Sequence, residues 1–229
     1  MIGIVIPAHN EDSLIRECLE AALTAAHHPD LNGEVVEILV VLDACSDGTA
    51  DIVSHYPVGS ATVAARNVGV ARAAGAQQLL DRGARWLAFT DADSHVGADW
   101  LVQQLRQHAD VVCGTVAVLD WSDHLQQACE LENHFNRTYT DADGHRHIHG
   151  ANLGLSADAY RSVGGFSPLV SSEDVALVEA LQKAGARIAW TAAPRVMTSA
   201  RRLARAPAGF AAALCLAVDA LLASALAAE

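Results

Sequence analysis

Trp86-Leu87-Ala88-Phe89-Thr90-Asp91-Ala92-Asp93 is an apolar segment that changes abruptly into two carboxylates. Its first half has the unbroken apolar character of a strand buried on both faces of a parallel sheet. Its second half places two acidic side chains one residue apart, directly where the strand ends. The segment therefore predicts a polar site at the carboxyl end of a buried strand.

Two further apolar runs, residues 2–6 and residues 35–42, precede this strand, and a short strand is expected to end at Val63. Between the runs, residues 13–26 place apolar side chains at helical spacing, and residues 67–80 form an alanine-rich helix. Strands that alternate with helices predict an α/β fold with a Rossmann-like, mostly parallel central sheet and helices on both faces.

Polar residues follow each of the three strong strands. They are residues 7–11 after the first, Asp43 after the second, and Asp91 with Asp93 after the third. The carboxyl ends of parallel strands meet at one edge of the sheet, which is where such sheets bind ligands. We therefore expect three separate loops to build one site.

Composition limits the kind of ligand. The chain has 229 residues, is 52% hydrophobic and carries a net charge of -12. Its only lysine is Lys183, so no lysine-rich surface is available to neutralise a nucleic acid backbone, and nucleic acid is set aside as a partner. An acidic protein can still bind a nucleotide when a metal ion supplies positive charge.

The five cysteines are scattered and contain no CxxC pair. This pattern indicates reduced thiols and a cytoplasmic protein, not a disulfide framework or a zinc site. The first residues run directly into an apolar strand, so no signal peptide is expected.

The chain is predicted to form one domain over residues 1–205, with a nucleotide-binding part (1–95) and an acceptor-binding part (96–205). Residues 206–229 are rich in alanine and leucine and predict a C-terminal helix. A charged residue at the bilayer centre costs about 2.5–3.5 kcal/mol, so Asp219 argues against a membrane span. The helix is expected to pack, to form a homodimer, or to contact the inner face of the membrane peripherally.

The acceptor-binding part has weaker patterns. Strands are expected at 111–118, 145–149 and 187–190, helices at 123–136, 157–163 and 173–184, and a tight turn at Gly150-Ala151-Asn152.

Several short motifs together resemble the family 2 glycosyltransferases of the GT-A fold. The resemblance covers about residues 2–200 and rests on the order and spacing of the following segments: Ile4-Val5-Ile6-Pro7-Ala8-His9-Asn10-Glu11, Val41-Leu42-Asp43 with Ser46-Asp47-Gly48-Thr49, Ala65-Arg66-Asn67 with Gly69 and Ala71-Arg72, Asp91-Ala92-Asp93, Gly150-Ala151-Asn152, and Ser172-Glu173-Asp174.

The resemblance implies a divalent metal at the acidic pair. Asp93 would be the direct ligand of Mn²⁺ or Mg²⁺, and Asp91 would contact the ribose or bind the metal through water. Both ions are hard cations that prefer carboxylate and phosphate oxygens. The alternative is a polar turn that follows a strand.

The resemblance also implies a nucleoside pocket and a helix-start arginine near the base or a phosphate. His9 departs from the tyrosine or phenylalanine that is common in the family, so a base-stacking role for it is in doubt. The predicted donor-binding residues are Pro7, Ala8, His9, Glu11, Asp43, Arg66 and Asp91.

On the acceptor side, the resemblance makes Asp174 the general base and Glu173 a residue that orients the acceptor. An inverting transfer needs a base that removes the proton of the attacking hydroxyl. The alternative is an acidic first turn that the helix dipole favours. The predicted acceptor-binding residues are Asn152, Ala151 and His149.

Two other clusters are open to more than one interpretation. His145, His147 and His149 could form a metal triad, but an exposed or acceptor-facing strand is favoured. A late arginine cluster could clamp a pyrophosphate, meet anionic lipid, or form a plain basic surface; it consists of Arg195, Arg201, Arg202 and Arg205.

The resemblance thus implies a metal-dependent enzyme that moves a single sugar from a UDP- or GDP-sugar to an acceptor hydroxyl, and inverting displacement is implied by the family alone. The sequence does not identify the acceptor, and a lipid-linked molecule, a protein, a polysaccharide and a small metabolite stay open. One alternative is a haloacid-dehalogenase-like phosphatase with Asp91 as nucleophile. Another is a non-catalytic relative that binds nucleotide sugars.

Overall fold

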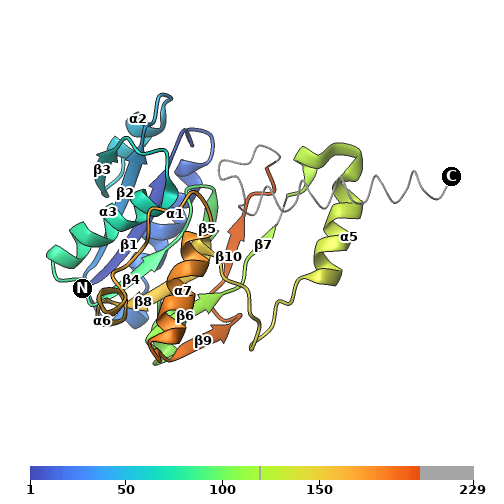
Figure 1. Ribbon diagram of the computed structural model, residues 1–229. Coiled ribbons are helices and arrows are strands. Elements are labelled where there is room, and N and C mark those ends of the chain that lie inside the picture. Colours follow the sequence, from blue (N-terminus) through green and yellow to red (C-terminus); the bar gives the residue numbers. More distant parts are fainter. Residues whose placement is uncertain (119, 202–229) are drawn as a thin grey trace.

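The computed structural model describes residues 1–118 and 120–201, which form two sheets and their covering helices (Figure 1). The large sheet has seven strands. In spatial order they are β3 (Gly59–Val63), β2 (Val36–Asp43), β1 (Ile2–Ala8), β4 (Trp86–Phe89), β8 (Leu153–Ser156), β6 (Val111–Gly114) and β9 (Ile188–Thr191). Only β8 runs antiparallel to its neighbours, β4 and β6. The predicted mostly parallel sheet is confirmed.

Helices cover both faces of this sheet. One face is covered by α1 (Ile15–Ala26), α2 (Thr49–Ser54) and α4 (Trp100–Arg106), and the other by α3 (Val68–Asp81), α6 (Ala157–Ser162) and α7 (Glu173–Lys183). Along β1, Ile4 and Ile6 pack into the first layer, whereas Val5 packs into the second. Because both faces are buried, the strands need the unbroken apolar runs seen in the sequence.

Helix α3 lies unusually close to the sheet, and Gly75 makes this possible. A Cβ atom at residue 75 would lie 2.6 Å from Val5 Cγ1 and 2.9 Å from Val41 Cγ2. A larger residue would force the helix away from β1 and β2. This close packing sets the position of the N-terminal end of α3, which faces the site.

A small sheet joins the end of β4 to the last described part of the chain. Its strands, in order, are β5 (Ser94–Val96), β10 (Val196–Thr198) and β7 (Ala117–Val118). The Ser94 hydroxyl donates to Thr198 Oγ1 at 2.9 Å, across the antiparallel pairing of β5 with β10. Residues 198–201 are thereby brought beside Asp93. Figure 1 shows β7 and β10 between the large sheet and α5 (Ala128–Thr138).

Three predicted elements differ from the structure. The strand predicted over 111–118 is two strands, β6 and β7, which belong to different sheets. The helix predicted over 123–136 is a 3₁₀ helix, η2 (Ser122–Gln127), followed by α5, with a break where Leu125 has a φ of 51°. The strand predicted over 145–149 is wrong, because residues 145–149 have no regular secondary structure.

The remaining short elements are η1 (Pro29–Leu31) and η3 (Gly150–Asn152), the latter at the predicted tight turn. Within residues 1–118 and 120–201, no helix is long and apolar enough to cross a membrane. The helix predicted for residues 206–229 and the domain boundary at residue 205 lie outside the described residues.

Candidate active site

The loops that follow β1 and β2 are interlocked. Asn10, with a φ of 55°, accepts a hydrogen bond from the Ser46 backbone N–H at 2.7 Å. The Glu11 backbone N–H donates to Thr49 Oγ1 at 2.7 Å. Two of the loops that the sequence predicted to share a site therefore form one structure.

Asp43 organises the start of α3. Its buried carboxylate accepts hydrogen bonds from the backbone N–H groups of Ala65 and Arg66, both at 2.8 Å, and of Asn67 at 2.7 Å. Arg66 is held with a φ of 48° and is exposed at the rim, and Asn67 caps α3 by accepting from Val70 at 2.9 Å. The observed contacts of Asp43 are thus structural, and the predicted ribose or base contact would be additional.

The rest of the predicted nucleoside loop lies beside Asp43. His9 Nδ1 is 2.6 Å from the carbonyl oxygen of Asp43, Pro7 is half-buried, and Ala8 is buried. The roles of these residues toward a donor stay predictions.

Asp91 and Asp93 stand at the end of β4, as predicted, and each faces an arginine. Arg72 Nη2 lies 2.5 Å from Asp91 Oδ1. Arg201 Nη2 lies 3.0 Å from Asp93 Oδ2, and Arg201 Nη1 lies 2.7 Å from both carboxylate oxygens of Glu11. The Asp93 side chain is nearly buried, whereas that of Asp91 is 35% exposed.

The site concentrates negative charge away from water. The pKa of Asp93 is raised to about 6, mainly by burial and also by the neighbouring carboxylates Asp91 and Glu11, while Arg201 opposes the rise. Carboxylates held this close without bulk water favour a bound cation.

Arg72 links the donor side to the acceptor side, and it was not among the predicted site residues. Its guanidinium contacts Asp91 through Nη2 and Glu173 through Nη1, and it is buried. Burial alone would lower the pKa of Arg72, but Asp91 and Glu173 raise it, so the side chain stays charged. The available signal was a lone arginine at position 72 inside an alanine-rich helix.

Glu173 and Asp174 begin α7, after Ser172 with a φ of 59°. The Glu173 carboxylate is buried against Arg72, and burial raises its pKa in spite of that arginine. Asp174 Oδ2 accepts from the Gly150 backbone N–H at 2.8 Å, and its Oδ1 accepts from Val175 at 2.8 Å. Asp174 thus contacts the loop that carries the predicted acceptor residues directly, whereas Glu173 contacts Arg72.

Gly150 must be glycine. A Cβ atom there would lie 2.3 Å from the Arg72 guanidinium carbon. The absence of a side chain lets the backbone approach Arg72 closely and donate to Asp174.

Asn152 and Ala151 are both buried. The Asn152 amide donates to the carbonyl oxygens of Thr115 at 2.7 Å and Pro194 at 2.9 Å, and its oxygen accepts from Trp100 Nε1 at 2.8 Å. An acceptor contact through the amide N–H groups would require one of these bonds to break, because both N–H groups are already used. These contacts are those of a residue that holds the loop after α5 against the sheet.

His149 belongs to a row of stacked rings. Tyr139 stacks on His147 with ring centres 4.1 Å apart, and the Tyr139 hydroxyl is 2.9 Å from His149 Nε2. Burial lowers the pKa of His149 to about 4, so this imidazole is neutral at pH 7. The rings alternate as in an extended segment, but residues 145–149 pair with no strand of either sheet, so the predicted strand is absent. Over residues 1–118 and 120–201, no group of three or more His, Cys, Asp or Glu side chains is arranged to hold a metal ion.

The two described arginines of the predicted C-terminal arginine cluster lie in different environments. Arg195 pairs with Asp141 at 2.5 Å at the surface, whereas Arg201 lies in the site. Arg202 and Arg205 lie outside the described residues. Cysteines 18, 45, 113 and 129 are free, and Cys215 also lies outside the described residues.

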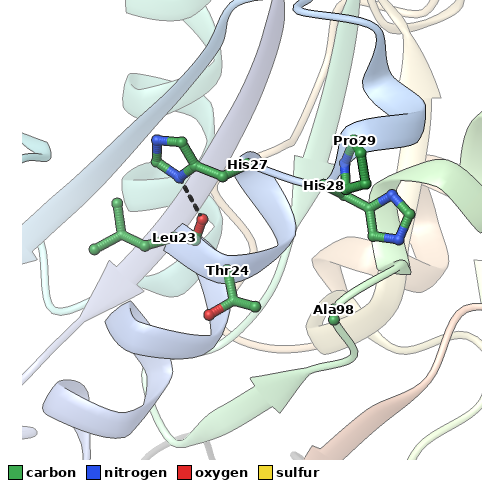
Figure 2. A pocket seen from close by; sticks show the side chains of 6 residues that line it. All are labelled: Leu23, Thr24, His27, His28, Pro29 and Ala98. Carbon is green, nitrogen blue, oxygen red and sulfur yellow. Dashed lines mark hydrogen bonds between the residues drawn. The ribbon is translucent and has the colours of Figure 1, made fainter.

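A shallow pocket lies elsewhere, at the C-terminal end of α1 (Figure 2). The His27 ring contacts the Leu23 carbonyl oxygen at 2.7 Å on its wall. Its lining residues are Leu23, Thr24, His27, His28, Pro29 and Ala98. None of them follows the carboxyl end of a strand in the large sheet, so this pocket is not part of the candidate site.

The carboxylate cluster lies at the carboxyl ends of strands in a mostly parallel α/β sheet, which is where nucleotide-binding proteins of this class hold their ligands. The family model for glycosyl transferase family 2 matches residues 3–164. The chain therefore belongs to this family, and the predicted resemblance is confirmed. A search of curated proteins found no match.

Solved structures share the fold. TarS 1–349 of S. aureus in complex with UDP-GlcNAc has a TM-score of 0.63 at 17% identity, covering 91% of this chain and 61% of that one. The mannosyltransferase PcManGT of Pyrobaculum calidifontis in complex with GDP-Man and Mn²⁺ has a TM-score of 0.56 at 19% identity, covering 86% of this chain and 56% of that one. The GT-A fold is confirmed, and this chain spans about three fifths of those proteins.

Proposed function

We propose that this protein transfers a single sugar from a nucleoside-diphosphate sugar, of the UDP or GDP class, to an acceptor hydroxyl by inverting displacement. Asp93, assisted by Asp91, would hold a divalent metal, and Asp174 would be the general base. Family membership supports the reaction class.

One observation carries the proposal: a single buried guanidinium, that of Arg72, contacts both Asp91 and Glu173. Asp91 belongs to the proposed metal-binding pair, and Glu173 immediately precedes the proposed base. The proposed metal-binding pair and the helix start that carries the proposed base are thereby held close together by one side chain, and a direct displacement requires the donor and the acceptor to be close.

The donor-side residues fit a hard divalent cation. Asp93 and Asp91 offer carboxylate oxygens at the end of β4, and Glu11 lies across from Asp93. The Arg201 guanidinium lies between Asp93 and Glu11 as a stand-in cation, so the carboxylates of the described residues are arranged around a guanidinium and not around a metal ion. A divalent cation bound here would neutralise the charge that develops on the leaving diphosphate. Asp93 would be the ligand that holds this cation. The loop organised by Asp43 would offer backbone groups to the nucleoside.

The acceptor-side residues fit proton removal. Two backbone N–H groups fix the Asp174 carboxylate, and each oxygen keeps a further lone pair for the acceptor hydroxyl. His149 is neutral and hydrogen-bonded to Tyr139, so it adds no positive charge that would pair with the Asp174 carboxylate. Asp174 thus removes the proton while the hydroxyl attacks the sugar carbon.

The experiment compares nucleotide release from a panel of UDP- and GDP-sugars in the presence of Mn²⁺ and candidate acceptors. Asp174→Asn should lower kcat by about 10²–10⁴-fold and keep donor binding. Asp93→Asn should weaken donor binding in Mn²⁺, and Asp158→Asn, at a fully exposed position of α6, should behave as wild type. Full transfer by Asp174→Asn would rule that residue out as the base.

The phosphatase alternative gains no support. The Asp91 carboxylate that would act as its nucleophile is engaged by Arg72, and the family match is to transferases. A non-catalytic relative would bind a nucleotide sugar and show no acceptor-dependent release in the same assay.

A further inference from the structure

We infer that Arg201 is an internal competitor of the metal: its guanidinium fills the cation position in the metal-free protein and leaves when a divalent cation binds. The inference deepens the proposed function, on which it rests for the identity of the competing ligand. It assigns a regulatory contact to a side chain that the mechanism above does not use.

Two carboxylates from different parts of the chain surround one guanidinium, which is the arrangement of a cation-binding site. Arg201 reaches Glu11 and Asp93, which follow two different strands, through both terminal nitrogens at 2.7–3.0 Å. The side chains of Arg201, Glu11 and Asp93 are 20%, 6% and 9% exposed, so the contact is shielded from solvent. The contact consists of charge-assisted hydrogen bonds, and loss of the guanidinium without a replacement cation would leave two shielded carboxylates unpaired.

The charge of the site explains why a cation is needed there. Glu11 and Asp93 meet at a single guanidinium, and both side chains are largely shielded from water. The Arg201 guanidinium is a permanent cation, because an arginine side chain is not deprotonated in proteins. A side-chain cation therefore stabilises the acidic cluster when no metal does.

The two cations cannot share the site. A small divalent ion binds carboxylate oxygens at about 2.0–2.1 Å. Asp93 Oδ2 is already engaged by Arg201 Nη2 at 3.0 Å, and the planar guanidinium occupies the space between Asp93 and Glu11. Metal binding between Asp93 and Glu11 therefore requires the Arg201 side chain to move away.

The backbone beside Arg201 is anchored, which keeps this exchange local. Ala200 is buried against Trp121 and Leu131, and its carbonyl oxygen is 2.6 Å from His124 Nε2. The Arg201 backbone N–H donates to Ser199 Oγ at 3.1 Å. The side chain can leave the carboxylates while β10 keeps its place.

The first test measures Mn²⁺ binding to the full-length protein by electron paramagnetic resonance, without nucleotide. Arg201→Gln should bind Mn²⁺ about 5- to 150-fold more tightly than wild type, the range of typical coupling between competing sites. Arg195→Gln, which removes an exposed arginine paired with Asp141, should leave the affinity unchanged. Equal or weaker Mn²⁺ binding by Arg201→Gln overturns the inference.

A second test separates exchange from a general effect of charge. Wild-type protein is treated with phenylglyoxal with and without Mn²⁺, and each arginine is followed by peptide mass spectrometry. Arg201 should react severalfold faster with Mn²⁺ present, whereas Arg195 should not change. A rate at Arg201 that Mn²⁺ leaves unchanged or lowers contradicts the exchange. The proposed function fails on a different result, the absence of acceptor-dependent nucleotide release in wild type.

Discussion

At the residue scale, the site depends on the buried guanidinium of Arg72, which pairs with two carboxylates. Removing Arg72 leaves Asp91 and Glu173 without compensation, and Glu173 is buried. Arg72→Met should therefore lower the free energy of unfolding by about 3–5 kcal/mol, as measured by chemical denaturation. Arg161→Met, at an exposed position of α6, should cost less than about 0.5 kcal/mol. Equal losses in the two variants would show that the buried pairs contribute nothing.

The pH dependence of stability has a residue-scale cause at His149. Its pKa falls from 6.5 to about 4, first because of burial and then because His147 and His145 lie nearby, while Asp91 opposes the fall. The unfolded chain therefore binds more protons between these values, and stability is lost as the pH falls from about 6.5 to about 4. The loss attributable to this group is at most about 3 kcal/mol.

The measurement compares denaturation of wild type and His149→Gln from pH 7 to pH 4. The variant should lose less stability over this range than wild type, because the glutamine has no proton to gain. His27→Gln, at an exposed position after α1, serves as the control. Parallel curves for wild type and His149→Gln would exclude His149 as the source.

At the element scale, the close approach of α3 to the sheet predicts that an alanine at residue 75 destabilises the protein, although helix propensity alone predicts the opposite. Alanine is the better helix former by about 1 kcal/mol, but a Cβ at residue 75 would lie 2.6 Å from Val5 Cγ1. Overpacking of this kind costs about 1–3 kcal/mol, so Gly75→Ala should lower the melting temperature. Gln77→Ala, on the exposed face of α3, should change it little. A stabilised Gly75→Ala would mean that the helix can move away freely.

The elements that could be predicted from the sequence are those with strong local patterns. The unbroken apolar runs of β1, β2 and β4 mark strands buried on both faces. Strands β5 and β10 have three residues each, too few to show a period. The row of rings over residues 145–149 alternates like a strand and stacks on Tyr139, but the sequence could not show that the segment has no partner strand in either sheet.

At the scale of the whole molecule, part of the candidate site follows from topology alone. Residues at the ends of β1, β2 and β4 had to meet once the sheet was parallel, and they do. The arginine partners could not be predicted this way. Arg72 and Glu173 are 101 positions apart, and Arg201 and Glu11 are 190 apart, so no local period connects them. Such pairs appear only when the chain is folded.

The central claim is that the carboxylate cluster binds a nucleoside diphosphate through a divalent metal. Thermal stability with UDP, GDP, dTDP and CMP, each with and without Mn²⁺, tests it most directly. A ligand at about 100 times its dissociation constant stabilises the fold by about 2.7 kcal/mol. The account predicts a raised melting temperature with UDP or GDP that requires Mn²⁺ and is lost in Asp93→Asn. No shift with any nucleotide, in protein that is folded, would contradict it.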